Sequence, residues 1–209
     1  MTTSGGSPSA AQVSRNKKMV LLMFLLPVMM IGAAYFVFFT GIGVPQSTTN
    51  KGVLVRPAQP LSALSFVDSG QSVVSIESLH GQWVIIIPGS GGCDQPCIDK
   101  LYLSRQIRTA LGKESHRLSR LYLSFNGPPS MQLQDLLTSQ HPDLAVARTS
   151  EIDWQNLLLK GGQDVEAHDG YYLVDPRGYV MMAYTDEHSG GDTLSDLRFL
   201  MKYSSEIKR

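Results

Sequence analysis

The sequence has few cysteines and no surplus of charge, and each shortage excludes a class of protein. Only two of its 209 residues are cysteine, too few for a scaffold built from disulfides, so the fold must depend on an apolar core. The 18 basic residues are balanced by 18 acidic ones, and the chain therefore lacks the basic footprint of a nucleic-acid-binding protein. No internal repeat is present, which leaves an ordinary globular chain with some added apolar sequence.

Charge is also missing from one long stretch near the N-terminus. No charged residue lies between Lys18 and Lys51, and residues 20–39 alone would form a helix about 30 Å long, the thickness of a hydrocarbon core. A cleaved signal peptide is the alternative, with small residues at 32–34 as the cleavage site. The apolar run continues to Phe39, whereas the apolar core of a signal peptide covers only about 7–15 residues. We therefore predict an uncleaved transmembrane anchor at residues 19–42.

The basic residues before this anchor predict its orientation. Arg15, Lys17 and Lys18 precede the apolar run and should stay in the cytoplasm, so that residues 1–18 form a disordered cytoplasmic tail. The remainder would lie in the periplasm of a bacterium or the equivalent mitochondrial space. The tail lacks the arginine-rich pattern of a transit peptide, which favours a single-pass protein of the bacterial inner membrane. A cysteine pair in the periplasm can be oxidised.

Beyond the anchor, residues 43–60 show no periodicity and are predicted to be a linker, and residues 61–209 alternate strand and helix patterns. The run "WVIII" at 83–87 is typical of a strand buried on both faces. A helix is expected at 96–111, because proline suits a first turn and Gly112 a stop. Further elements are predicted as a short hairpin around 68–70, strands at 120–125 and 143–149, helices at 130–140, 150–160 and 193–209, and a hairpin over 171–184.

This order predicts an α/β domain with a central mixed sheet and helices on both faces. Both cysteines lie in "GSGGCDQPCIDK", where the first buried strand ends and a helix begins. That position completes a thioredoxin-like layout for residues 61–209.

The spacing of Cys93 and Cys97 leaves three uses open: a redox pair, a metal site or a structural staple. The start of a helix favours a thiolate, the form that attacks disulfides and binds soft metals. Residues four apart in such a turn can approach each other, although the thioredoxin-type motif has one residue fewer. A staple would close a very short loop and would add little stability, so redox or metal chemistry is favoured.

The exported part resembles the Sco/SenC family of thioredoxin-fold proteins, which help to mature the copper centre of cytochrome c oxidase. The resemblance covers about residues 61–184, and the anchor matches in topology only. It depends on the lead-in "FVDSGQ…LHGQWVIII", on "CDQPC" directly after that strand, and on "YYLVDPRGYV" near the end.

This resemblance implies that Cys93, Cys97 and a downstream histidine bind copper, and His168 in "VEAHDGYYLVDPRG" is the candidate. It also implies the inner membrane and an oxidase subunit or another assembly factor as partners. The chain departs from the family pattern in three ways: Ile98 stands where the family has proline, Gly-Ser-Gly-Gly precedes Cys93, and His168 lies four residues before Tyr172, where five are expected.

Three functions follow as hypotheses. The first is a membrane-tethered assembly factor that delivers copper or reduces thiols, with Cys93 attacking a client and Cys97 resolving the mixed disulfide. The second is a non-catalytic scaffold of the same pathway that has lost metal binding. The third is a peroxiredoxin-like peroxidase, which needs an arginine and a threonine placed around the attacking cysteine, and no such motif is seen. The remaining histidines are expected to be exposed surface residues: His80, His116, His141 and His188.

Overall fold

The structure is a computed structural model, and it describes residues 10–40, 50–68, 80–125, 127–162 and 170–204. The chain divides into two compact units, Met1–Thr48 and Thr49–Arg209. In the first unit the structure describes one helix, α1 (Ala10–Thr40). Its portion Asn16–Thr40 has a mean hydropathy of 2.4 and is long and apolar enough to cross a membrane.

Helix α1 begins earlier than the sequence indicated. Residues 10–18 were expected to belong to a disordered tail, but they are helical. Alanine, glutamine, arginine and lysine are good helix formers, and adding residues to an existing helix costs far less than starting one. The predicted anchor at 19–42 lies within this helix up to Thr40, and its last two positions lie outside the described residues.

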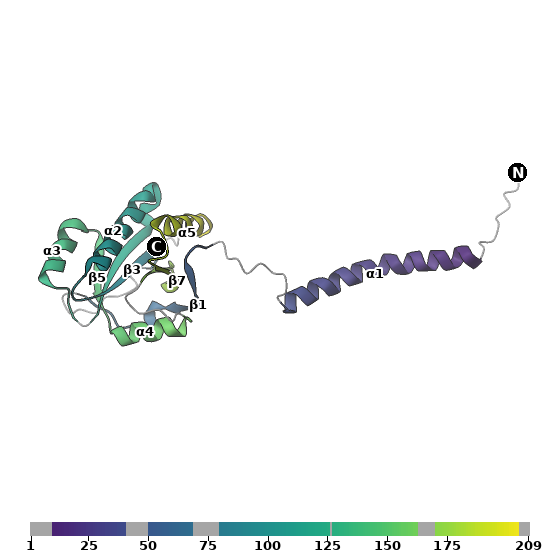
Figure 1. Ribbon diagram of the computed structural model, residues 1–209, viewed down its shortest axis with the longest axis horizontal. Coiled ribbons are helices and arrows are strands. Elements are labelled where there is room, and N and C mark those ends of the chain that lie inside the picture. Colours follow the sequence, from purple (N-terminus) through teal and green to yellow (C-terminus); the bar gives the residue numbers. More distant parts are fainter. Residues whose placement is uncertain (1–9, 41–49, 69–79, 126, 163–169, 205–209) are drawn as a thin grey trace. The chain divides into compact units, whose positions relative to one another are not determined.

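The second unit is built on one mixed sheet, with helices on both faces as predicted (Figure 1). Strands β3, β4 and β5 run parallel, and the remaining pairings are antiparallel. The seven strands lie in the order β1 (Val53–Pro60), β7 (Tyr179–Thr185), β6 (Gly170–Val174), β3 (Trp83–Ser90), β4 (Leu118–Phe125), β5 (Leu144–Arg148) and β2 (Val67–Asp68).

Among the described residues of this unit, four α-helices cover the sheet: α2 (Gln95–Ala110), α3 (Met131–Gln140), α4 (Glu151–Lys160) and α5 (Gly190–Tyr203). Buried side chains of α2, α3 and α5 form one apolar cluster with one face of the sheet. Helix α4 packs on the opposite face (Figure 1), where the fully buried Trp154 contacts the ring of Tyr172 at 5.1 Å between centroids. Two short 3-10 helices, η1 (Leu61–Ala63) and η3 (Gly112–Arg117), complete the described elements.

Most of the predicted elements are confirmed within one to three residues. Strand β3 pairs with β4 on one side and β6 on the other, and seven of its eight residues are buried, as a continuous apolar run requires. Helix α2 ends before Gly112, whose φ of 58° suits glycine. Ser150 caps α4 by accepting a hydrogen bond from the Asp153 backbone N–H at 3.4 Å. The predicted hairpin around 68–70 extends into residues 69–79, outside the described residues.

The predicted linker at 43–60 is wrong in its second half, because residues 53–60 form strand β1. Val55 is 3% exposed, and the Arg56 backbone N–H donates to the carbonyl of Gly161 at 2.8 Å. Two prolines, at 57 and 60, concealed the strand in the sequence. Proline is tolerated here because β1 lies at the edge of the sheet. The folded domain therefore begins before Leu61.

Candidate redox site

The two cysteines lie where strand β3 ends and helix α2 begins. Asp94 caps α2: its carboxylate accepts a hydrogen bond from the Cys97 backbone N–H at 3.2 Å, and its carbonyl accepts one from Ile98 at 2.9 Å. Pro96 occupies the first turn, where its missing N–H would have had no helical partner. Cys97 is thereby placed within the first turn, at the positive end of the helix dipole.

Cys93 and Cys97 are joined by a disulfide, with 5.3 Å between their Cα atoms. The two sulfurs differ in environment. Cys97 is 8% exposed and belongs to the apolar cluster beneath α2, whereas Cys93 is half-buried and packs against that cluster. In the reduced form, Cys93 would be the thiol that a large partner reaches first.

A cleft of about 680 Å³ opens beside this disulfide. Its lining combines small and apolar residues of the β3–α2 loop with three charged side chains: two carboxylates, Asp94 and Asp186, and the ammonium group of Lys100. A volume of this size accommodates several residues of a polypeptide. The two sulfurs therefore face a space that a protein segment could enter.

The loop before Cys93 is held by a residue that the sequence analysis did not single out. The Tyr122 hydroxyl donates a hydrogen bond of 2.6 Å to the Ser90 carbonyl. Burial, with a smaller contribution from the Asp94 charge, raises the pKa of Tyr122 to about 12. Tyr122 lies inside the alternating segment 120–125, and nothing in the sequence distinguishes it from an ordinary core residue.

The described residues supply two soft metal ligands at this site and no more. Within the part of the chain that the structure describes, no three His, Cys, Asp or Glu side chains are grouped so that they could hold a metal ion. His168 lies outside the described residues. Once reduced, the Cys93 and Cys97 sulfurs fit a soft ion such as Cu(I), which prefers thiolate ligands.

Comparison with known proteins places residues 83–204, from the start of β3 to the residue after α5, in the family "Transmembrane-like, thioredoxin-like, C-terminal domain". The chain belongs to this family. A comparison with curated proteins gave no match.

Solved structures with the same fold include Sco proteins. Yeast Sco1 is 19% identical, with a TM-score of 0.56 over 72% of this chain and 98% of its own. Copper-bound yeast Sco1 is 17% identical, with a TM-score of 0.55 over 78% of this chain and 99% of its own. BsSco is 20% identical, with a TM-score of 0.52 over 76% of this chain and 99% of its own. It is described as a Sco-family cytochrome c oxidase assembly protein with a disulfide switch. The thioredoxin-like fold and the likeness to Sco proteins are thus confirmed at the level of the fold.

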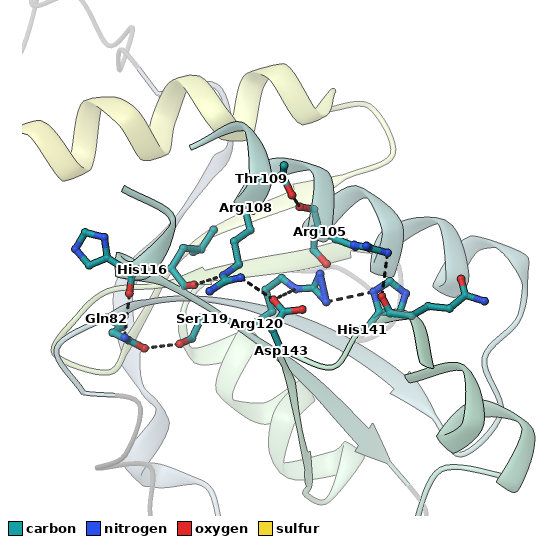
Figure 2. A network of polar contacts seen from close by, with 12 residues as sticks. Gln82, Arg105, Arg108, Thr109, His116, Ser119, Arg120, His141 and Asp143 are labelled. Carbon is teal, nitrogen blue, oxygen red and sulfur yellow. Dashed lines mark hydrogen bonds and ion pairs between the residues drawn. The ribbon is translucent and has the colours of Figure 1, made fainter. Parts of the chain in front are cut away.

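A polar network, buried at Arg120 and His141, lies beneath the second half of α2 (Figure 2). Arg120 is fully buried in β4; it donates to Nδ1 of His141 at 3.3 Å and lies 3.7 Å from the carboxylate of Asp143. Arg108 of α2 also pairs with Asp143, at 3.0 Å. Burial, and secondarily the charge of Arg120, lowers the pKa of His141.

The expectation that His141 is exposed is therefore wrong, since it is 1% exposed. Polar neighbours in the sequence suggested a surface position, but His141 ends α3 and its ring packs edge-on against Tyr102 of α2 at 5.2 Å. His80 and His116 are exposed as expected, whereas His188 is half-buried and accepts a hydrogen bond from the Thr185 backbone N–H at 3.1 Å.

Proposed function

We propose that this protein is a membrane-tethered, thioredoxin-like factor that assists the assembly of a respiratory cytochrome oxidase through the Cys93–Cys97 pair. The observation that carries the proposal is a disulfide at the start of a helix, facing a cleft large enough for a short peptide segment. The similar fold of BsSco, a protein named for oxidase assembly and for a disulfide switch, supports both the pathway and the chemistry.

The reaction that fits this geometry is thiol–disulfide exchange. In the reduced protein the half-buried Cys93 thiolate attacks a disulfide of the client, forming a mixed disulfide and releasing one client thiolate. Cys97 then attacks the Cys93 sulfur, restores the internal disulfide and releases the second client thiolate. Two electrons pass to the client, and each released thiolate takes up a proton from solvent.

Copper transfer is a second activity of the same two sulfurs, with Cu(I) as cargo. The copper-bound structure of yeast Sco1 supports this proposal, as does the softness of the two sulfur donors. His168 is proposed as the third ligand. The alternative to both activities is a non-catalytic scaffold of the assembly pathway that has lost metal binding.

The location proposed is the bacterial inner membrane, with α1 as a single anchor and the thioredoxin-like domain in the periplasm. The basic residues Arg15, Lys17 and Lys18 precede the apolar span, which favours a cytoplasmic N-terminus. The partner would be an oxidase subunit or another assembly factor.

A reporter fused after Arg209 tests this orientation. It should be active only outside the cytoplasm, and activity confined to the cytoplasm would contradict the proposed orientation.

Alkylation tests the redox role. After mild reduction, the folded full-length protein in detergent should label at both cysteines, with Cys93 faster than Cys97, and reoxidation should remove both reactive thiols. The variants Cys93→Ser and Cys97→Ser identify each site. Unreactive cysteines in a folded protein would refute thiol exchange.

A Cu(I) titration against a competing chelator tests the metal. The reduced protein should hold one Cu(I), and His168→Ala should weaken binding while His116→Ala, an exposed histidine beyond the far end of α2, should not. Equal affinity in both variants would limit the ligands to the two sulfurs. No binding at all would refute copper transfer and leave thiol exchange, or the scaffold if the alkylation test also fails.

A further inference from the structure

Tyr122 lies directly under the loop that carries the cysteines. It belongs to β4, opposite Ile87 of β3, and its side chain is fully buried. The ring lies in the same apolar cluster as Cys97, and Cys93 packs against that cluster. Its hydroxyl bonds to the Ser90 carbonyl at 2.6 Å, so one side chain connects the centre of the sheet to the start of the cysteine loop.

Gly89 fits the Tyr122 ring because it has no side chain. A Cβ at position 89 would lie 2.5 Å from the Tyr122 hydroxyl oxygen and 2.9 Å from the nearest ring carbon, closer than real Cβ atoms approach such atoms. The ring and the glycine therefore depend on each other. Any other residue at position 89 would displace either the ring or the loop.

Three consecutive carbonyls, from the last residue of β3 into the loop, accept hydrogen bonds. Ser90 accepts from Tyr122, Gly91 from the Ser130 backbone N–H at 2.6 Å, and Gly92 from the Ser90 hydroxyl at 2.9 Å. The bond to Gly91 comes from the residue that caps α3, and the bond to Gly92 comes from the loop itself. Ser90 is the last residue of β3 and is in register with Phe125 of β4, so the Tyr122 bond adds a side-chain link to β4 at the point where the chain leaves the sheet toward Cys93.

We infer that Tyr122 is a positioning residue that sets the equilibrium between the dithiol and the disulfide. Its hydroxyl holds the loop so that Cys93 stays within disulfide range of Cys97. When this bond is removed, the dithiol form gains freedom because its loop can relax, whereas the cross-linked form cannot relax. The loss therefore costs the disulfide form more, and the pair becomes easier to reduce. This inference rests on the proposed redox function.

The test is Tyr122→Phe, which removes the hydroxyl and keeps the ring. Full-length protein in detergent is equilibrated with glutathione buffers, and the oxidised fraction is measured by alkylation and mass spectrometry. One neutral hydrogen bond corresponds to a factor of about five in an equilibrium constant. Both forms lose this bond and only the dithiol recovers by relaxing, so the equilibrium constant for forming the disulfide should fall by a factor of about two to five.

The matched control is Tyr171→Phe. Tyr171 is also buried, at 4% exposure, and its hydroxyl bonds to Thr193 at 2.6 Å. A merely structural hydroxyl would lower stability in either variant and leave the redox equilibrium unchanged. If the two variants give the same equilibrium constant as the wild type, the inference is wrong.

A second pair of variants tests the contact with Gly89. Gly89→Ala should by itself make the disulfide easier to reduce, because the added methyl group pushes against the Tyr122 hydroxyl. In the Gly89→Ala background, Tyr122→Phe should have a much smaller effect than in the wild type, because that bond is already disturbed. Effects that simply multiply would show that the two residues act separately, against the inference. A wild-type pair that never cycles in glutathione would instead refute the proposed function itself.

Discussion

Replacing Asp196 with alanine should destabilise the thioredoxin-like domain by about 3 kcal/mol. Asp196 lies in α5 at 4% exposure. Its carboxylate accepts hydrogen bonds from the backbone N–H groups of Lys51 and Gly52, both at 2.9 Å, and from the Tyr184 hydroxyl at 3.0 Å. Through these bonds α5 holds the first described residues of the second unit.

The magnitude follows from the donors left behind. The Gly52 N–H and the Tyr184 hydroxyl are buried, and each buried donor costs about 1–3 kcal/mol when it loses its acceptor. The Lys51 N–H is only partly buried and can bond to water instead. Asp196→Ala also removes the cost of burying a carboxylate. Subtracting this cost from the penalty of the two buried donors leaves an expected loss of about 3 kcal/mol. Asp196→Asn keeps one acceptor oxygen and should fall between alanine and the wild type.

Urea unfolding of the full-length protein in detergent, followed by tryptophan fluorescence, measures this loss. The chain has two tryptophans, and both Trp83 and Trp154 are buried in the domain, so the signal reports on the domain alone. The control is Asp99→Ala, which removes an exposed carboxylate bonded to the Gln95 side chain and should change stability by less than about 0.5 kcal/mol. Equal stabilities of the Asp196 and Asp99 variants would refute the reasoning.

Three further predictions concern pH, thiol reactivity and the extent of the domain. Burial lowers the pKa of His141 below its ordinary 6.5. The stability contributed by the neutral ring is therefore present above about pH 6.5 and is lost as the pH falls. Between pH 7 and pH 5, urea unfolding of His141→Gln should show a smaller loss of stability than urea unfolding of the wild type. Asp94→Asn keeps a cap on α2 but removes a negative charge between the thiols, and it should speed alkylation of the reduced pair at pH 7, while Asp99→Asn should not. Fragment 49–209 should unfold cooperatively on heating, whereas 61–209, which lacks strand β1, should melt at a lower temperature or without a clear transition.

The core of the fold could be predicted because its signals are local. The run at 83–87 is apolar without interruption, which only a strand in the middle of a sheet or a buried helix can accommodate, and its length and β-branched residues favour the strand. Helix α2 has a proline in its first turn and a glycine after its end. Likewise, the turn at 175–178 follows from the chemistry of proline and glycine. Each of these elements is specified by a few neighbouring residues.

The parts that could not be predicted depend on contacts between distant segments. Strand β1 has too little alternation to be recognised, and it is stabilised by pairing with β7, more than a hundred residues later. His141 is buried because the end of α3 meets Tyr102 and Arg120, which no local pattern reveals. The role suggested for Tyr122 depends on the register between β3 and β4, which brings it under the loop of the cysteines.

The geometry of the Cys93–Cys97 disulfide argues that its value lies in chemistry more than in stability. It spans a sequence separation of only four residues, for which the loop-closure estimate gives about 2 kcal/mol, compared with about 4.7 kcal/mol for a loop of 100 residues. The same loop is already held without the disulfide, by the Asp94 cap and by hydrogen bonds to three successive carbonyls. A segment so restrained gains little from a cross-link as a structural element. The same restraint keeps the two thiols close when they are reduced, and this is what a pair needs in order to open and close repeatedly beside a cleft.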